Sequence, residues 1–205
     1  MELIVSLVRH GVTEWNKVHR YQGQTDVPLS DDGRVQAELL ATRFRSSAIT
    51  SWVSSDLSRA AETADIVARL HPEASIQRDP AWREMHLGDL EGEMAQNVRD
   101  SYPELMKRWL ESPSGIHMPG GESLLVLQER VWAALEALRE SDGSGHIAVF
   151  SHGFAIISVL CRVLGIELDS FRRLWIDPTG VSQLERRRGA WIVRCINDTG
   201  HLAAK

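Results

Sequence analysis

The chain has 205 residues and a net charge of −5 at pH 7, with 43% hydrophobic and 25% charged residues, the proportions of an ordinary soluble globular protein. These values exclude a disordered or collagen-like chain, and the negative charge provides no general attraction for nucleic acid. A chain of this length can bury roughly 70% of its extended surface without disulfide or metal staples, so we expect one domain.

Two apolar runs of strand length, Leu3 to Val8 and Ile147 to Phe150, predict strands that are covered on both faces, as in an α/β sheet. Between them, two sets of apolar residues at helical spacing predict helices that flank the sheet. The first set is Val35, Leu39, Leu40 and Phe44, and the second is Leu57, Ala61, Ala64 and Ala68. Ser30 is the expected N-cap of the first helix, and Ser55 or Asp56 that of the second.

The second half of the chain continues the alternation of helix and strand. A stripe that follows the turn at residues 119–121 predicts a helix that ends before the loop at residues 142–145; it consists of Leu124, Leu127, Val131, Leu135 and Leu138. Ser182 to Arg187 and Trp191 to Ile196 predict a C-terminal hairpin. Residues 85–120 lack a clean pattern apart from a helix near Ala95 to Leu110. We expect them to form a cap-like insertion over the sheet, within a single domain of residues 1–205.

Features that indicate a compartment or a metal are few. Cys161 and Cys195 lie far apart in apolar sequence and lack the spacing of a zinc site. No apolar run approaches the roughly 18 residues of a membrane span, and no basic segment precedes the short apolar run at the N-terminus. We therefore expect a reduced, cytoplasmic protein that uses no metal and no cofactor and has neither membrane nor nucleic acid as a partner.

Two histidines follow the two predicted central strands, in Arg9-His10-Gly11 and Ser151-His152-Gly153. Ligands of open α/β sheets bind beyond the carboxyl ends of the strands, so both histidines are expected at one edge. The helix predicted after Gly153 would direct free backbone N–H groups to the same place, which suits a phosphate. Either histidine alone can simply end its strand and hydrogen-bond a loop, but the repeated placement favours a ligand site.

Five blocks of sequence, in order, resemble the histidine phosphatase superfamily, whose fold is shared with cofactor-dependent phosphoglycerate mutases. They are Arg9–Asn16 with Tyr21-Gln22-Gly23 and Pro28–Gly33, Ser54–Ala60 with Glu62-Thr63-Ala64, Arg83-Glu84 with Gly88 and Glu91-Gly92, Pro119–Ser123, and Ser151-His152-Gly153. The resemblance implies a three-layer α/β/α sandwich with a mostly parallel central sheet.

The resemblance also implies catalytic roles. His10 would be the nucleophile, which agrees with its chemistry because a neutral imidazole has a free lone pair and a phosphohistidine is labile. Arg9 and Arg59 match the phosphate-binding arginines, whose forked donors can neutralise the phosphoryl oxygens. His152 matches a second histidine that stabilises the transferring group. Glu84 matches the general acid that protonates the departing alkoxide and later acts as a base towards water.

Further phosphate- or substrate-binding positions implied by the resemblance are Asn16, Gln22, Gly23, Gly153 and Phe154. Asn16 and Gln22 can alternatively serve only to cap loops. On composition alone Glu14 and Glu91 rival Glu84 as the acid, and the family pattern is what selects Glu84. Of the aromatic residues, Trp15 and Trp109 can line the mouth of the pocket.

Among the activities of the superfamily, the sequence favours metal-independent hydrolysis of small-molecule phosphate monoesters through a phosphohistidine. The mutases carry a longer basic insertion after the acid block and an Asn after the second His-Gly, where this chain has only Lys107-Arg108 and Phe154. A cofactor-dependent phosphoglycerate mutase is the alternative within the fold, and a non-catalytic phospho-ligand-binding regulatory module is the alternative from another class. The expected partner is a small phosphate ester, and a homodimer remains an option.

Overall fold

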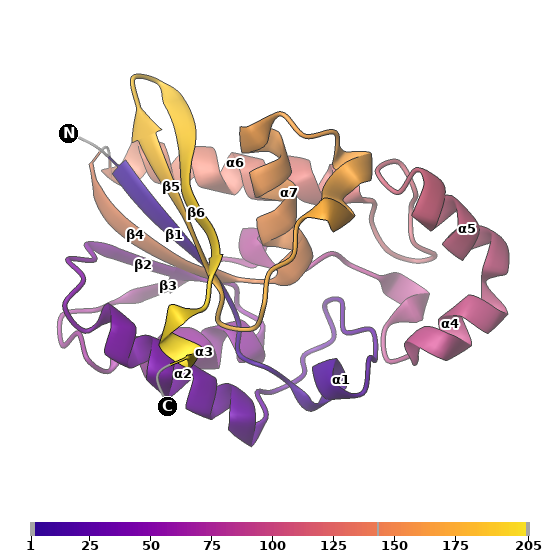
Figure 1. Cartoon of the computed structure of the whole chain (residues 1–205), viewed down its shortest axis with the longest axis horizontal. Helices are drawn as coiled ribbons and strands as arrows, with labels where there is room; N and C mark the ends of the chain where they lie inside the picture. Colours follow the sequence, from indigo (N-terminus) through magenta and orange to yellow (C-terminus); the bar gives the residue numbers. More distant parts are fainter. Residues whose placement is uncertain (1–2, 143, 204–205) are drawn as a thin grey trace.

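A six-stranded mixed sheet with helices on both faces forms the centre of the computed structural model, which describes residues 3–142 and 144–203 (Figure 1). Its strands, in chain order, are β1 (Leu3–Arg9), β2 (Ser51–Ser54), β3 (Ile76–Arg78), β4 (Gly145–Ser151), β5 (Val181–Arg187) and β6 (Ala190–Asp198). They lie in the order β3-β2-β4-β1-β5-β6, and the pairs from β3 to β1 are parallel while β5 and β6 are antiparallel. This confirms the predicted α/β fold with a mostly parallel sheet.

Two pairs of long helices cover the two faces of the sheet. The helices are α1 (Glu14–Lys17), α2 (Asp31–Phe44), α3 (Ser58–Ala68), α4 (Ala95–Ser101), α5 (Pro103–Glu111), α6 (Leu124–Asp142) and α7 (Gly153–Leu164). Short 3₁₀ turns occupy Pro80–Trp82, Gly88–Leu90, Leu168–Arg173 and Gly200–Leu202. Helices α2 and α3 pack with Val8 and Phe150 on one face, whereas α6 and α7 pack with Val5, Leu7 and Val149 on the other. The strands are therefore buried on both sides, as their unbroken apolar runs predict.

The buried side of α2 differs from the predicted stripe. Val35 is 59% exposed, and small residues such as Gly33 and Ala37 face the interior with Leu40. The reason is the close approach of α2 to the chain after β1, since a Cβ added at Gly33 would lie 2.1 Å from the carbonyl oxygen of Val12. Only a helix face made of small residues can approach the backbone this closely. Because this face points inward, Val35 points towards solvent.

The start of α3 also corrects a prediction. Its N-cap is Leu57, which makes no side-chain capping bond, whereas Ser30 caps α2 as predicted by accepting from the N–H of Gly33. Ser55 and Asp56 lie ahead of the first turn and have other partners. The hydroxyl of Ser55 contacts His152, and the carboxylate of Asp56 pairs with Arg83 at 2.5 Å.

The stretch predicted as a cap contains two helices where one was expected between Ala95 and Leu110. The helix breaks at Pro103, because proline has no N–H for the helical hydrogen bond and disfavours a helical residue before it. In Figure 1, α4 and α5 stand beyond the end of the sheet, on the side of α1 and α7. Val98, Trp109 and Met118 join the same apolar cluster as α6 and α7, so the stretch packs onto the main core.

The remaining elements agree with the sequence in kind and differ in their ends. Strands β5 and β6 form the predicted hairpin, with Arg188 and Gly189 at positive φ in its turn. Helix α6 continues to Asp142, where a loop was expected, and Gly143 of that loop lies outside the described residues. In the part of the chain that is described, no helix is long and apolar enough to cross a membrane.

Candidate functional site

The two histidines meet at the carboxyl edge of the sheet, as the sequence predicts. Strands β1 and β4 run parallel with Arg9 opposite Ser151, so the residues that follow them, His10 and His152, are neighbours. Their ring centroids lie 5.1 Å apart at an angle of 58°, and the backbone N–H of His10 donates to the carbonyl of Ser151. The pairing register of the central strands therefore positions both imidazoles.

A cavity of about 260 Å³ opens beside His10. Its walls include the predicted site residues Arg9, His10, Asn16, Gln22, Gly23, Arg59, Glu84, Gly153 and Phe154. Of the predicted site residues, only His152 does not line the cavity. Its ring lies next to the ring of His10, which does. The wall also contains residues without a predicted role, among them Arg20, Tyr21 and Trp175.

His10 is a buried imidazole whose proton is fixed on one nitrogen. Its Nδ1 lies 2.7 Å from the carbonyl oxygen of Gly11 and must donate to it, because a carbonyl can only accept. Burial, followed by the charges of Arg59 and Arg9, holds the pKa of His10 well below its ordinary value. The ring is therefore neutral at physiological pH, and its Nε2 lone pair is available for attack on an electrophile.

His152 is equally buried and neutral, since burial and the charge of Arg59 hold its pKa well below the ordinary value. Its Nε2 lies 2.9 Å from the hydroxyl of Ser55. Its Nδ1 is buried and has no hydrogen-bond partner among the described residues. A buried ring nitrogen without a partner is costly, so this atom is suited to donate to a ligand oxygen.

Two arginines give the cavity a positive charge. Arg59 is 1% exposed and donates through Nη1 to the carbonyl of Thr25 and through Nη2 to that of Gly23. Arg9 donates through Nη1 to the carbonyl of Ile176. Within the described residues neither guanidinium forms an ion pair, and the Nε of each is buried without a partner. Burial lowers the pKa of Arg59 to about 10, which leaves it charged at neutral pH.

Glu84 is the acidic group of the cavity. Its carboxylate oxygens accept from the backbone N–H groups of Met85 at 2.9 Å and Phe154 at 3.2 Å, the latter at the start of α7. Burial nevertheless raises the pKa of Glu84, because it outweighs these two hydrogen bonds and the arginine charges. Arg9 Nε and Glu84 Oε2 both lie 3.7 Å from the position that a Cβ at Gly153 would take. The carboxyl group is therefore placed to exchange a proton beside the arginines.

Glu14 and Glu91, the rivals of Glu84 on composition, lie outside the cavity wall. Glu14 is exposed and pairs with Lys17 at 2.8 Å. Glu91 accepts from the backbone N–H groups of Gln24, Thr25 and Leu87, and so ties together the loop whose carbonyls hold Arg59. Its carboxylate therefore holds this loop and is not part of the wall of the cavity beside His10.

Asn16 and Gln22 both hold the loop and line the cavity. The carbonyl oxygen of Asn16 accepts from the N–H and the hydroxyl of Thr13, which forms a capping box at α1. The carbonyl oxygen of Gln22 lies 2.8 Å from the same hydroxyl. Loop capping thus occupies one end of each side chain, while each residue is also part of the cavity wall.

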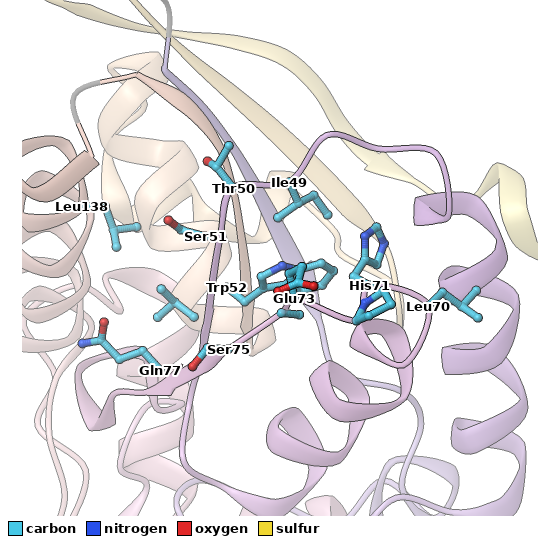
Figure 2. A pocket seen from close by; sticks show the side chains of 13 residues that line it. Ile49, Thr50, Ser51, Trp52, Leu70, His71, Glu73, Ser75, Gln77 and Leu138 are labelled. Carbon is cyan, nitrogen blue, oxygen red and sulfur yellow. The ribbon is translucent and has the colours of Figure 1, made fainter.

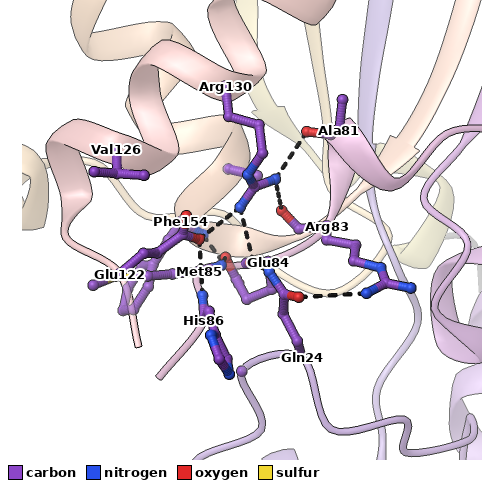
Figure 3. A network of polar contacts seen from close by, with 12 residues as sticks. Gln24, Ala81, Arg83, Glu84, Met85, His86, Glu122, Val126, Arg130 and Phe154 are labelled. Carbon is purple, nitrogen blue, oxygen red and sulfur yellow. Dashed lines mark hydrogen bonds and ion pairs between the residues drawn. The ribbon is translucent and has the colours of Figure 1, made fainter. Parts of the chain in front are cut away.

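A network around Arg130 fixes the segment that carries Glu84 (Figure 3). Arg130 donates through Nη1 to the carbonyls of Ala81 and Arg83, and through Nη2 to the carbonyl of Glu84 at 3.3 Å. Its Nη2 also lies 2.6 Å from Glu122, whose carboxylate accepts from the backbone N–H of His86. Arg130 could not be found from the sequence, because nothing in a helical sequence indicates that a charged side chain binds the carbonyls of a distant turn.

A larger hollow of about 620 Å³ lies away from this cavity. It is lined by residues around β2 and the chain after α3, such as Thr50, Trp52, His71 and Gln77, and contains none of the predicted site residues (Figure 2). Within residues 3–142 and 144–203, no group of three or more His, Cys, Asp or Glu side chains is placed to hold a metal ion.

The sheet, its strand order and its helices form a phosphoglycerate mutase-like α/β fold. The structure of YhfR from Bacillus stearothermophilus superposes with a TM-score of 0.93 at 27% identity, covering 98% of this chain and 99% of that one. The chain belongs to the histidine phosphatase superfamily (branch 1), whose family model matches residues 5–199. The sequence motifs predicted this membership.

Two other similar proteins bear names that refer to different activities. A protein from Photorhabdus laumondii subsp. laumondii described as probable phosphoglycerate mutase GpmB is 35% identical over 98% of this chain and 95% of its own length. A mycobacterial glucosyl-3-phosphoglycerate phosphatase in complex with VO3 has a TM-score of 0.85 at 27% identity, covering 95% of this chain and 98% of its own.

Proposed function

We propose that this protein is a metal-independent phosphatase that hydrolyses small-molecule phosphate monoesters through a phosphohistidine formed on His10. The observation that carries the proposal is the state of His10: it is buried, neutral and held by Gly11 through Nδ1, so that Nε2 keeps its lone pair beside Arg9 and Arg59. Arg59, which is buried, and the half-buried Arg9 form no ion pairs among the described residues, and each has a buried Nε without a partner, so this wall is suited to a phosphate group.

In the first step, Nε2 of His10 attacks phosphorus and the bond from phosphorus to the ester oxygen breaks. Glu84, in its protonated form, gives its proton to that oxygen, so an alcohol departs in place of an alkoxide. Arg9, Arg59 and His152 neutralise the charge on the transferring oxygens. In the second step the Glu84 carboxylate takes a proton from water, the oxygen attacks phosphorus, and the N–P bond breaks to release phosphate and neutral His10.

A cofactor-dependent phosphoglycerate mutase is the second candidate, and the 35% identical probable mutase from Photorhabdus favours it. A mutase must hold a phosphoglycerate in two orientations and keep water from the phosphohistidine. Against it, the described cavity wall adds only Arg20 to Arg9 and Arg59 as a further cation for the carboxylate. The phosphatase is thus the better match to the wall.

A screen separates these functions from a non-catalytic module. Phosphate release is measured from phosphosugars, phosphoglycerates, phosphoserine, nucleotides and α-ribazole phosphate, with a chelator present and no added metal. Conversion of 3-phosphoglycerate to 2-phosphoglycerate is measured with and without a bisphosphoglycerate primer. Phosphate release under chelation supports the proposal, primer-dependent conversion without release identifies a mutase, and binding without either identifies a regulatory module.

Replacement of Arg59 by lysine is expected to lower kcat/KM by about 100-fold or more. Lysine keeps the charge, but it cannot donate to the carbonyls of Gly23 and Thr25 while it binds a phosphoryl oxygen. The matched control is Arg69→Lys, because Arg69 follows the same helix and its side chain is 64% exposed. Phosphate-release kinetics and thermal unfolding of both variants give the test, and near-native kinetics for Arg59→Lys would place the phosphate elsewhere.

Replacement of Arg130 by lysine is expected to lower kcat by about tenfold to hundredfold for alkyl phosphates, with little change in KM. The variant loses the bonds that hold the backbone of residues 81–84, so the carboxyl group of Glu84 moves relative to the ester oxygen. Aryl phosphates should lose less, since a phenolate departs without an acid. Arg162→Lys, on the exposed pair with Glu129, is the control. An equal loss on both substrate types would reduce Arg130 to a general structural role.

A further inference from the structure

Trp175 is the most exposed large apolar side chain in the described part of the chain, at 70%, yet its ring is held in place. The indole Nε1–H donates to Asp177 at 2.8 Å, and the carboxylate of Asp177 accepts from the side-chain amide of Asn197 at 2.8 Å. Asn197 in turn accepts from the backbone N–H of Asp177. The only polar atom of Trp175 is therefore used to fix an indole whose faces meet solvent.

The ring of Trp175 lines two adjoining hollows. Trp175 lines the cavity beside His10 and also an adjoining hollow of about 420 Å³, together with Arg9, Asn16, Arg20 and Tyr21. Of the two tryptophans that were expected to be able to line the mouth of the pocket, Trp15 lines the second hollow, whereas Trp109 is buried against Phe154. A phosphate held at Arg9 and Arg59 therefore has room on this side for an alcohol part much larger than glycerate.

The second hollow also has a cation with no carboxylate partner. Arg20 is exposed and forms no ion pair within the described residues, and its guanidinium lies 5.3 Å from the ring centroid of Trp15. Lys17 lines the same hollow, but its charge is compensated by Glu14 at 2.8 Å and Asp32 at 2.7 Å. Arg20 thus offers a positive charge, supported by an aromatic face, in the adjoining hollow, which Arg59 does not line.

We propose that Trp175 and Arg20 form the leaving-group site of the enzyme. The site takes phosphate monoesters whose alcohol carries a ring, which stacks on Trp175, and an anionic group such as a carboxylate, which Arg20 binds. The inference rests on the proposed function, because it assumes that the phosphate lies between Arg9, Arg59 and His10.

The test uses the purified full-length protein and four alkyl phosphates whose ester oxygen is bonded to a CH₂ group. Ethyl phosphate has no ring, cyclohexylmethyl phosphate has a saturated ring, benzyl phosphate has an aromatic ring, and 4-carboxybenzyl phosphate adds a carboxylate. We expect kcat/KM of the native protein to rise by about fivefold to tenfold from ethyl to a ring, and by about fivefold more with the carboxylate. The two ring substrates show whether a saturated or an aromatic ring is preferred.

Variants at Trp175 and Arg20 assign these gains to the two side chains. Trp175→Ala should bring the ratio of kcat/KM between the ring substrates and ethyl phosphate to about one, and Trp175→Phe should restore part of the ratio. Arg20→Gln should remove only the carboxylate gain, whereas Arg69→Gln, at an exposed arginine elsewhere, should change neither. The inference would be overturned if the native protein had equal kcat/KM for all four substrates, or if Trp175→Ala lost the same factor on all four. Hydrolysis of the four substrates would in either case still support the proposed function. If the native protein hydrolyses none of the four but releases phosphate from a substrate of the earlier screen, only the inference is overturned; if it releases phosphate from no substrate of either set, both are overturned.

Discussion

Replacement of His10 by alanine is expected to abolish phosphate release from every substrate, with a loss of about 10⁴-fold or more. No second histidine lines the described cavity wall, because His152 lies behind His10 and contacts Ser55 through Nε2. Inorganic phosphate should still bind weakly through Arg9 and Arg59. The measurement is phosphate release in the presence of a chelator. His117→Ala, at an exposed histidine of the chain before α6, is the control that should keep full activity.

The same variant tests the covalent intermediate. Brief incubation of the native protein with a substrate labelled in its phosphoryl group should leave an adduct that is labile in acid and stable in base, as expected of a phosphohistidine. The His10→Ala variant should carry none. An adduct on a serine or aspartate, or phosphate release by the variant at a native rate, would contradict the assignment of His10.

Replacement of Glu84 by glutamine is expected to lower the first-step rate on alkyl phosphates by about 10²-fold to 10⁴-fold. A sugar or glycerol oxygen leaves poorly as an alkoxide, so it needs the proton of Glu84, whereas the phenolate of an aryl phosphate departs unaided. The comparison of an alkyl and an aryl substrate in single-turnover experiments checks this. Because Glu84 also acts as the base towards water, the variant should show a burst of phenol followed by slow turnover. Equal loss of the first step on both substrates would leave Glu84 only a positioning role.

The pH dependence of the rate also tests the assignment of Glu84 as the general acid. Burial raises the pKa of Glu84 above its ordinary value, so its carboxyl stays protonated to a higher pH in the folded protein than in the unfolded chain. Expulsion of the alcohol requires that proton, and the rate on alkyl phosphates should therefore fall as the pH rises through the pKa of the folded state. In Glu84→Gln this upper limb should be absent. A limb that persists in the variant would belong to another group.

The residues of the site that follow strands could be predicted, because the carboxyl ends of parallel strands share one edge. His10 and His152 are the clearest case. The role of Glu84 as general acid was implied only by the family motifs, and its contact with the start of α7 was not predicted. Arg130 and Trp175 escaped prediction for one physical reason. Their roles depend on contacts with residues distant in sequence, the carbonyls of residues 81–84 and the carboxylate of Asp177, which no local spacing reveals.

The fold was predictable where side-chain size and hydrogen bonding act locally. The apolar runs identify β1 and β4, and Ser30 identifies the start of α2. Predictions were wrong where close packing overrides periodicity, as at Val35, which is displaced from the interior because Gly33 must approach Val12. Pro103 is a local signal for a helix break, but the pattern of residues 95–110 favoured one continuous helix and this signal was overlooked.

The pairing of β1 with β4 determines when the site can exist. Ser6 on β1 contacts His146 on β4 across a sequence separation of 140 residues, and His10 receives its neighbour His152 only through this pairing. During synthesis, β1 therefore remains without its central partner β4 until most of the chain has been made. Until then the apolar run of β1 is exposed and can be bound by chaperones. Closure of so long a loop is entropically slow. The active centre is consequently assembled late, and recovery of activity reports complete folding of the central sheet.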